Sequence, residues 1–202
     1  SSSITSVEAG GSVNLGLRAP SGPGTLTITV TTLTTIGQVF TAAGTPVVTG
    51  SVLTADELTG LTYTPPADYT AGTPVGAFGY SVSNGTDSVD GGTRIAVTPV
   101  NDAPLAIYTS NSGGEDILLD VSLAGTDIDG TVASVAVRTL PANGTLLLRD
   151  TLAPVAVGAA LTPAQAASLV FRPNANWNGS TTLTFTVTDN EGAVSAPATV
   201  QI

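Results

Sequence analysis

The chain has 202 residues, and its 15 acidic and 5 basic side chains give a net charge of −10. It contains no cysteine and no histidine, which excludes disulfides, zinc–thiolate sites and hydrolases built on a Ser–His pair. The acidic charge is spread over both halves, so we expect no binding to nucleic acid. No apolar run approaches the roughly 18 residues of a membrane span, so we also expect no membrane insertion.

The predicted secondary structure is nearly all β. Runs in which apolar residues alternate with Thr or Ser are typical of half-buried strands, and β-branched residues dominate these runs. Clusters of Gly, Pro, Asn and Asp separate them every 8 to 12 residues or so, as in a β-sandwich. In chain order the clearest runs are residues 12–17, 25–33, 117–123, 134–140 and 182–189.

Two short segments depart from the β pattern. "TADE" (54–57) and "TPAQ" (162–165) each place a Thr three residues before a Glu or Gln. This spacing is that of a capping box, in which the two side chains satisfy the free N–H groups at a helix start. We therefore expect one helical turn at each place, joining two strands.

The two halves of the chain repeat each other. "PVVTGSVLT" (46–54) aligns with "PVAVGAALT" (154–162), and "LTYTPPADY" (61–69) aligns with "LVFRPNANW" (169–177). The offset stays between 105 and 108 residues, which is about the length of one sandwich domain. The sequence predicts two antiparallel β-sandwiches in tandem, joined end to end: domains at 1–100 and 101–202, with a linker over 99–104.

Tyr69 and Trp177 occupy equivalent positions in this repeat. One interpretation is an aromatic plug at the corner of each core, and the other is a platform on which a sugar ring stacks. The plug is favoured, and a buried Trp177 ring would support it.

Side chains with oxygen ligands gather around the linker "VTPVNDAP" (97–104). We assume that the chain enters each sandwich at one end and leaves it at the opposite end. The direction of the strands then places these side chains at the end where the chain leaves the first domain or at the end where it enters the second, and both ends lie at the linker. Calcium takes six to eight oxygens from carboxylates, Asn and carbonyls, so one to three calcium ions would relieve the repulsion there. The predicted ligands are Glu8, Asp68, Asn101, Asp102, Asp127, Asp129 and Asp189.

Other acidic positions are expected to differ from these ligands. The Asp-x-Asp-Gly turn at residues 127–130 is not by itself specific, since such turns also occur without metal. The equivalent stretch of the first half, "APSGPG" (19–24), has no acidic residue, so no calcium site is expected there. Glu115 aligns with Glu8, but its ion would need a third domain. Asp116 and Asp120 are expected to be solvated charges on a strand face.

The stretches "VTPVNDAP", "GEDILLDVSLAGTDIDG" and "LVFRPNANWNGSTTLTFTVTDNEG" resemble the cadherin-like, Ig-like tandem repeats of large secreted bacterial adhesins. The resemblance covers the whole second half, and the first half mainly from Leu53 onward. It implies Ig/cadherin-like sandwiches, calcium at the junctions, and a place on the bacterial cell surface.

Three classes of function follow. The leading hypothesis is a set of calcium-rigidified extender repeats of a bacterial cell-surface adhesin, monomeric, with neighbouring repeats of the same chain as partners. The alternative is a β-sandwich module of a secreted protein that binds a host or biofilm surface polysaccharide or protein. An enzyme is not expected: paired carboxylates hydrolyse glycosides, but a glycosidase cleft is lined with aromatics, and the chain has only nine.

Overall fold

The computed structural model describes residues 2–202. The chain divides between Val100 and Asn101 into two compact units, each with its own hydrophobic core. About 43% of the residues are in strands and 4% in helices, so the predicted all-β class is confirmed.

Over residues 2–100, the first unit contains eight strands in two sheets. They are β1 (Ser2–Val7), β2 (Val13–Asn14), β3 (Thr27–Thr32), β4 (Gln38–Phe40), β5 (Val52–Leu53), β6 (Thr62–Thr64), β7 (Ala77–Ser83) and β8 (Ser88–Thr98). One sheet has the order β1-β8-β7-β3-β5 and the other β2-β6-β4. The core includes Leu15, Leu61, Tyr63 and Phe78, contributed by both sheets and the segments between them.

The second unit follows the same plan. Its strands are β9 (Leu105–Ile107), β10 (Thr109–Ser110), β11 (Leu119–Val121), β12 (Ala124–Thr126), β13 (Val132–Thr139), β14 (Gly144–Leu148), β15 (Ala160–Leu161), β16 (Leu169–Pro173), β17 (Thr182–Asp189) and β18 (Ala198–Gln201). The sheets are β10-β18-β17-β13-β15 and β11-β16-β14, with β12 and β9 as a separate pair. Phe171, Phe185 and Leu183 lie in the core.

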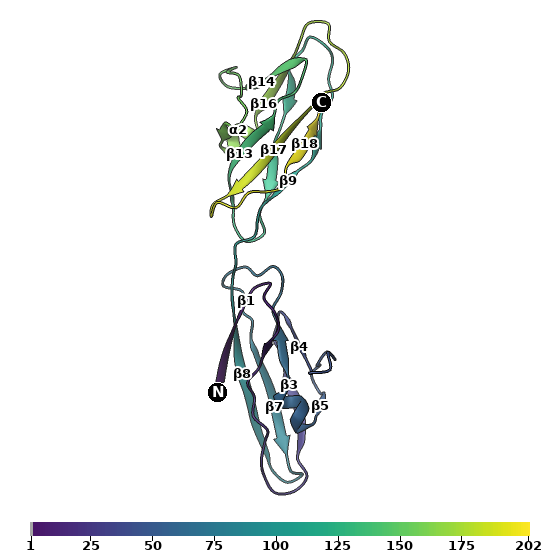
Figure 1. The fold of residues 1–202 in the computed structure, drawn as a ribbon, viewed down its shortest axis with the longest axis vertical. Coiled ribbons are helices and arrows are strands. Elements are labelled where there is room, and N and C mark those ends of the chain that lie inside the picture. The colour runs from purple at the N-terminus through teal and green to yellow at the C-terminus, as the bar shows by residue number, and fades with distance from the viewer. Residues whose placement is uncertain (1) are drawn as a thin grey trace. The chain divides into compact units, whose positions relative to one another are not determined.

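One strand pairing in each unit is parallel, whereas the sequence predicted antiparallel sandwiches. β1 runs beside β8 in the same direction, in register from Ser2 with Thr93 to Val7 with Thr98 (Figure 1). β10 pairs with β18 in the same way, through Thr109 with Val200 and its neighbouring pair. Parallel neighbours need a long crossover connection, and here nearly the whole unit separates the two strands in sequence.

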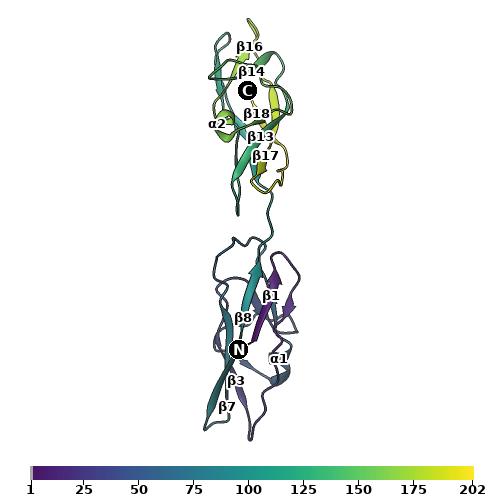
Figure 2. The same cartoon turned by 90° about the vertical axis from the view of Figure 1, so that its left-hand side faces the viewer.

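Both predicted helical turns are confirmed. α1 (Ala55–Thr59) joins β5 to β6, and α2 (Pro163–Ala166) joins β15 to β16 (Figure 2). Thr54 and Thr162 are the N-caps, and each completes a capping box with the Glu or Gln three residues later. The turns cross from one sheet of each unit to the other.

Two predicted strands are shorter than their sequence pattern. The run 12–17 is a strand only at β2, because the side chain of Asn14 accepts the N–H of Gly16 and turns the chain, with Gly16 at a φ of +65°. The run 117–123 is a strand only at β11, and Ile117 lies before it with more than half its surface exposed. The run 182–189 corresponds to β17 in full.

A glycine–aromatic contact recurs in the two units. A Cβ on Gly37 would lie 2.3 Å from the Tyr63 hydroxyl oxygen, and one on Gly144 would lie 2.3 Å from the Phe171 ring. Tyr63 pairs with Val13, and Phe171 pairs with Leu119. The same position in each sandwich therefore needs a residue without a side chain, so that a ring can pack against the backbone.

Candidate functional site

The turn after β12 holds two of the predicted ligands. Asp127 Oδ1 accepts the N–H groups of Asp129 and Gly130 at 3.3 and 3.2 Å, which fixes the turn. Gly130 leaves room for this arrangement, since a Cβ there would lie 2.6 Å from the Asn190 side-chain oxygen. One carboxylate oxygen of Asp127 thus stabilises the Asp-x-Asp-Gly turn, and its other oxygen, Oδ2, remains available to bind a ligand.

Asp189, at the end of β17, is almost fully buried, with 2% of its surface exposed. Its Oδ1 accepts the N–H groups of Glu191, Gly192 and Ala193, while its Oδ2 accepts the side-chain amide of Asn101 at 2.8 Å. The Asn101 amide, together with these backbone donors, holds the pKa of Asp189 below its ordinary value, although burial opposes the shift. Asp189 is therefore a carboxylate at neutral pH.

The two linker residues of the second unit are each bonded to one of its acidic side chains. Asn101 donates to Asp189, and the N–H of Asp102 donates to Asp129 Oδ2 at 3.2 Å. Three separate stretches of the unit, namely the linker, the turn after β12 and the end of β17, thus meet at one place.

Three oxygens at this place are buried and have no hydrogen-bond partner: Asn101 Oδ1, Asp127 Oδ2 and Asp129 Oδ1. In each case the other polar atom of the side chain is hydrogen-bonded, which orients the group. A buried polar atom without a partner costs about 1–3 kcal/mol, and more when it is charged. Carboxylate and amide oxygens are the ligands of a hard cation such as calcium, so the residues present fit that ion.

Within residues 2–202, no group of three or more acidic side chains has the arrangement needed to hold a metal ion as it stands. The oxygens described above come from two carboxylates and an amide. The two carboxylates each accept local backbone N–H groups on one oxygen, and the amide of Asn101 donates to Asp189.

The first unit contains the two other predicted ligands. Glu8 is 3% exposed, and its carboxylate accepts the N–H of Tyr69 on one oxygen and that of Val100, at 2.8 Å, on the other. A carboxylate has about four lone-pair sites, so these bonds leave acceptor capacity. Glu8 thereby holds the last residue of the first unit, which precedes Asn101 in sequence. Asp68 is exposed.

Other acidic and amide side chains have roles that sequence reasoning did not identify. Asp116 and Asp120 are exposed, as predicted, but Asp116 lies in a turn and not on a strand, where it accepts the N–H of Asn176 at 2.9 Å, and Asp120 on β11 forms an ion pair with Arg149. Asn190 accepts the N–H of Thr131 at 2.7 Å and thereby links the loop after β17 to the turn before β13. The only sequence indication of Asn190 was its position directly after Asp189.

The two equivalent aromatic residues differ in burial. Tyr69 is 8% exposed and donates its hydroxyl proton to the carbonyl of Thr73 at 2.7 Å, as expected of a core plug. Trp177 is half-buried and packs edge-to-face on Phe171, with ring centroids 6.0 Å apart. It also lines a pocket of about 170 Å³.

Residues 101–202, just over half of the chain, match the family described as "Bacterial Ig domain". The chain belongs to the bacterial Ig domain family. The Ig-type repeat predicted from the sequence motifs is thereby confirmed. Bacterial Ig domains are typically extracellular surface modules without enzymatic activity. Among the described residues, no helix is long and apolar enough to cross a membrane.

Solved structures similar to this bacterial Ig protein share little sequence with it. N-cadherin EC1-4 of Drosophila is 12% identical with a TM-score of 0.49, covering 100% of this chain and 48% of its own. Human protocadherin-24 EC1-2 is 13% identical with a TM-score of 0.47, covering 100% and 92%. The fibronectin(III)-like modules of Clostridium thermocellum CbhA are 13% identical with a TM-score of 0.26, covering 100% and 88%. No curated protein matches the chain in sequence.

Proposed function

We propose that this protein consists of extender repeats of a bacterial cell-surface adhesin, stiffened by calcium that binds at the linker. The observation that supports the proposal is the set of three buried, unpaired oxygens on Asn101, Asp127 and Asp129. These side chains, together with Asp102 and Asp189, would hold the ion, and Glu8 and Asp68 of the first unit complete the proposed ligand set. When bound, calcium supplies the positive charge that these oxygens lack.

The residues on both sides of the Val100–Asn101 bond are held by buried acids. Glu8 holds the N–H of Val100, and Asp189 holds the side chain of Asn101. Without a cation, two like charges about 4 Å apart repel by roughly 4 kcal/mol at an effective dielectric constant of 20. Calcium removes this repulsion and selects the linker conformations in which its ligands converge. Stiffened repeats would hold a distal binding region away from the cell.

Calcium titration by calorimetry tests the metal site. The double variant Asp127→Ala, Asp129→Ala should lose the binding that the unchanged chain shows, with a dissociation constant on the order of 10⁻⁴ to 10⁻³ M. A matched control is Asp150→Ala with Glu115→Ala, which removes the same charge from exposed positions of the same unit. Unchanged calcium binding in the Asp127/Asp129 variant would reject the assignment.

Small-angle scattering tests the stiffening. Excess calcium should narrow the distribution of maximum dimensions, and a chelator should broaden it, whereas the double variant should show the broad distribution in both conditions. Identical profiles for the unchanged chain with and without calcium would mean that Pro99 and Pro104 alone set the stiffness.

The alternative proposal is a module that binds a surface polysaccharide or protein. The half-exposed ring of Trp177 is the observation in its favour, but the buried Tyr69 at the equivalent position of the first unit gives it no support. Quenching of Trp177 fluorescence by surface oligosaccharides at millimolar concentration would favour this function over the extender.

A further inference from the structure

Asparagine is followed by glycine at three places in the chain: Asn84, Asn143 and Asn178. An asparagine in this position can react with its own backbone. The glycine nitrogen attacks the side-chain carbon Cγ, a new C–N bond closes a five-membered succinimide, and Nδ2 leaves as ammonia with the proton of the glycine N–H. Water then opens the ring to give aspartate, or isoaspartate, in which the main chain runs through the side chain. Glycine allows the closure because it has no side chain to hinder it.

Three structural conditions govern this ring closure. The side-chain amide must be free to turn toward the backbone, and the peptide plane between the two residues must be free to rotate. The glycine N–H must also be free of a hydrogen bond, because the nitrogen loses its proton when it attacks. Since the three sites share the same dipeptide, any difference in their reactivity comes from how the fold holds the reacting atoms.

Asn84 lies in the turn between β7 and β8, where both reacting groups are held by hydrogen bonds. Its Oδ1 accepts the N–H groups of Thr86 and Asp87 at 2.9 and 2.8 Å. The N–H of Gly85 donates to Ser83 Oγ at 3.1 Å. The fold therefore protects Asn84 at both ends of the bond that would form.

Asn143 lies directly before β14 and is exposed, but its peptide plane is held. Its backbone carbonyl accepts the N–H of Asn174 at 2.9 Å. Gly144 packs so closely on the Phe171 ring that a Cβ would lie 2.3 Å from it. Rotation of the plane between residues 143 and 144 would break this hydrogen bond and disturb this packing, so Asn143 is protected in part.

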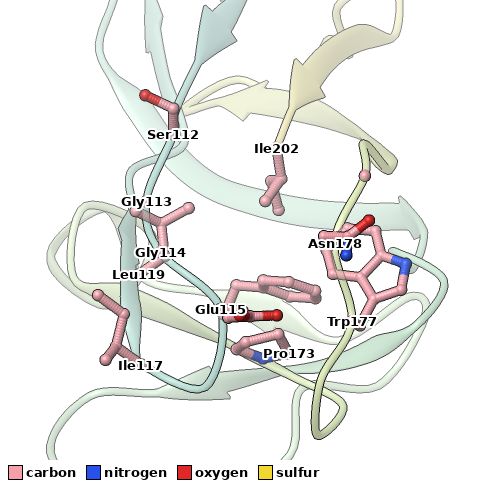
Figure 3. A pocket seen from close by; sticks show the side chains of 12 residues that line it. Ser112, Gly113, Gly114, Glu115, Ile117, Leu119, Pro173, Trp177, Asn178 and Ile202 are labelled. Atoms are coloured by element: carbon pink, nitrogen blue, oxygen red, sulfur yellow. The ribbon is translucent and has the colours of Figure 1, made fainter.

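Asn178 differs from both of these sites. Figure 3 shows it on the loop that carries Trp177. Asn178 and Gly179 are exposed and belong to no strand or helix. Among residues 2–202, neither of the two forms a hydrogen bond through its backbone or side chain. All three conditions for ring closure are therefore met at Asn178.

The exposure of this position is a property of the repeat. Tyr69 is the equivalent of Trp177, so Thr70 and Ala71 are the equivalents of the Asn-Gly pair. Both are exposed, although the Tyr69 ring before them is buried. The position therefore faces solvent whether or not the aromatic residue that precedes it is covered.

We infer that Asn178 is a site of spontaneous modification, which the folded chain converts to aspartate and isoaspartate with water as the only co-reactant. Each event replaces a neutral amide by a carboxylate. Because no hydrogen bond of the described chain depends on Asn178, the second unit stays folded as the product accumulates. The charge of this loop thus becomes more negative with the age of the molecule.

Mass spectrometry of the intact chain, aged in mildly alkaline buffer and then digested, tests the inference. Trypsin cleaves after arginine but poorly between Arg172 and Pro173, so the three sites fall in separate peptides: 19–94, 139–149 and 150–202. Aspartate and isoaspartate should form at Asn178, located by fragmentation of its peptide, at least roughly tenfold faster than at Asn84. A second sample aged in denaturant should lose this difference, since the sites then differ little in structure.

Two serine variants separate the effect of the fold from that of the sequence. Ser83→Ala removes the acceptor of the Gly85 N–H and should raise the rate at Asn84 severalfold. Ser180→Ala is the matched control, because Ser180 also lies beside an Asn-Gly pair but is exposed and forms no hydrogen bond within residues 2–202. It should leave the rate at Asn178 unchanged.

Equal rates at Asn84 and Asn178 in the folded chain would overturn the inference. Modification of Asn178 in denaturant but not in the folded chain would overturn it as well. None of these measurements involves calcium, so a failure here is distinguishable from a failure of the proposed function.

Discussion

At the scale of single residues, Glu8 and Glu115 have the same position in the repeat and opposite surroundings. Glu8 is buried and accepts two backbone N–H groups, whereas Glu115 is exposed. Their alignment could be read from the sequence. Their difference in burial could not, because it depends on how the segments around each carboxylate pack in three dimensions.

Replacing Glu8 with Gln should destabilise the first unit. The buried N–H of Tyr69 or the partly buried N–H of Val100 would then face an amide NH₂ group and lose its acceptor, at a cost of up to about 1–3 kcal/mol. Urea denaturation measures the change, and Glu115→Gln is the matched control, expected to alter stability by less than about 0.5 kcal/mol. Equal effects of the two substitutions would contradict the role assigned to Glu8.

The candidate calcium ligands show how far residue-level prediction reaches. Sequence spacing and strand direction predict five of the ligands at the start and within the second unit: Asn101, Asp102, Asp127, Asp129 and Asp189. Spacing could not show that Asp189 uses one oxygen on the N–H groups of its own hairpin, or that the remaining oxygen of Asp127 is buried without a partner. Those features arise from rotamers and from the packing of the turn, which are set by tertiary structure.

At the scale of elements, α1 and α2 use the same capping box with different chemistry. Glu57 in α1 accepts the backbone N–H and the hydroxyl of Thr54 at 2.8 and 3.0 Å, whereas Gln165 takes that place in α2. The Thr54 backbone bond, followed by its hydroxyl bond, lowers the pKa of Glu57 from its ordinary value of 4.5. Only the first unit therefore has a titratable capping box.

The stability of the first unit should depend on Glu57 at acidic pH. Because the folded pKa of Glu57 lies below the unfolded one, its stabilising contribution is complete above the ordinary value and is lost as pH falls through the folded value. Comparing urea unfolding of the first unit at neutral pH and at successively lower acidic pH should show this loss. Glu57→Gln should remove that part of the pH dependence, since a glutamine does not titrate. A variant with the same pH profile as the unchanged chain would refute this assignment.

The strands show which elements the sequence could predict. The alternation over 182–189 is uninterrupted, and β17 spans it in full. The alternation over 12–17 includes Asn14, whose side chain competes for a backbone N–H and ends β2 early. The parallel neighbour of β1 was not foreseen, because alternation reports which face of a strand is buried and not which strand lies beside it.

At the scale of the whole molecule, the unpaired oxygens of the candidate site all belong to the second unit. Asn101, Asp127 and Asp129 provide them, and that unit has its own core. A fragment of residues 97–202 should therefore bind calcium by itself, and under the proposed ligand set, which includes Glu8 and Asp68, it should bind more weakly than the full chain. Calorimetry on both proteins tests this expectation. A fragment that shows no binding, when the full chain binds, would mean that ligands of the first unit are indispensable.

The parallel pairing of β1 with β8 has a mechanical consequence. If the two chain ends are pulled apart, the start of β1 and the end of β8 are drawn in opposite directions along the strands, so all six residue pairs are loaded in shear at once. Under a rising stretching force in a single-molecule experiment, the first unit should therefore resist until these pairs rupture together in one event. Pulling on engineered cysteines that load β1 and β8 perpendicular to the strands should open those pairs one at a time and lower the rupture force of the first unit.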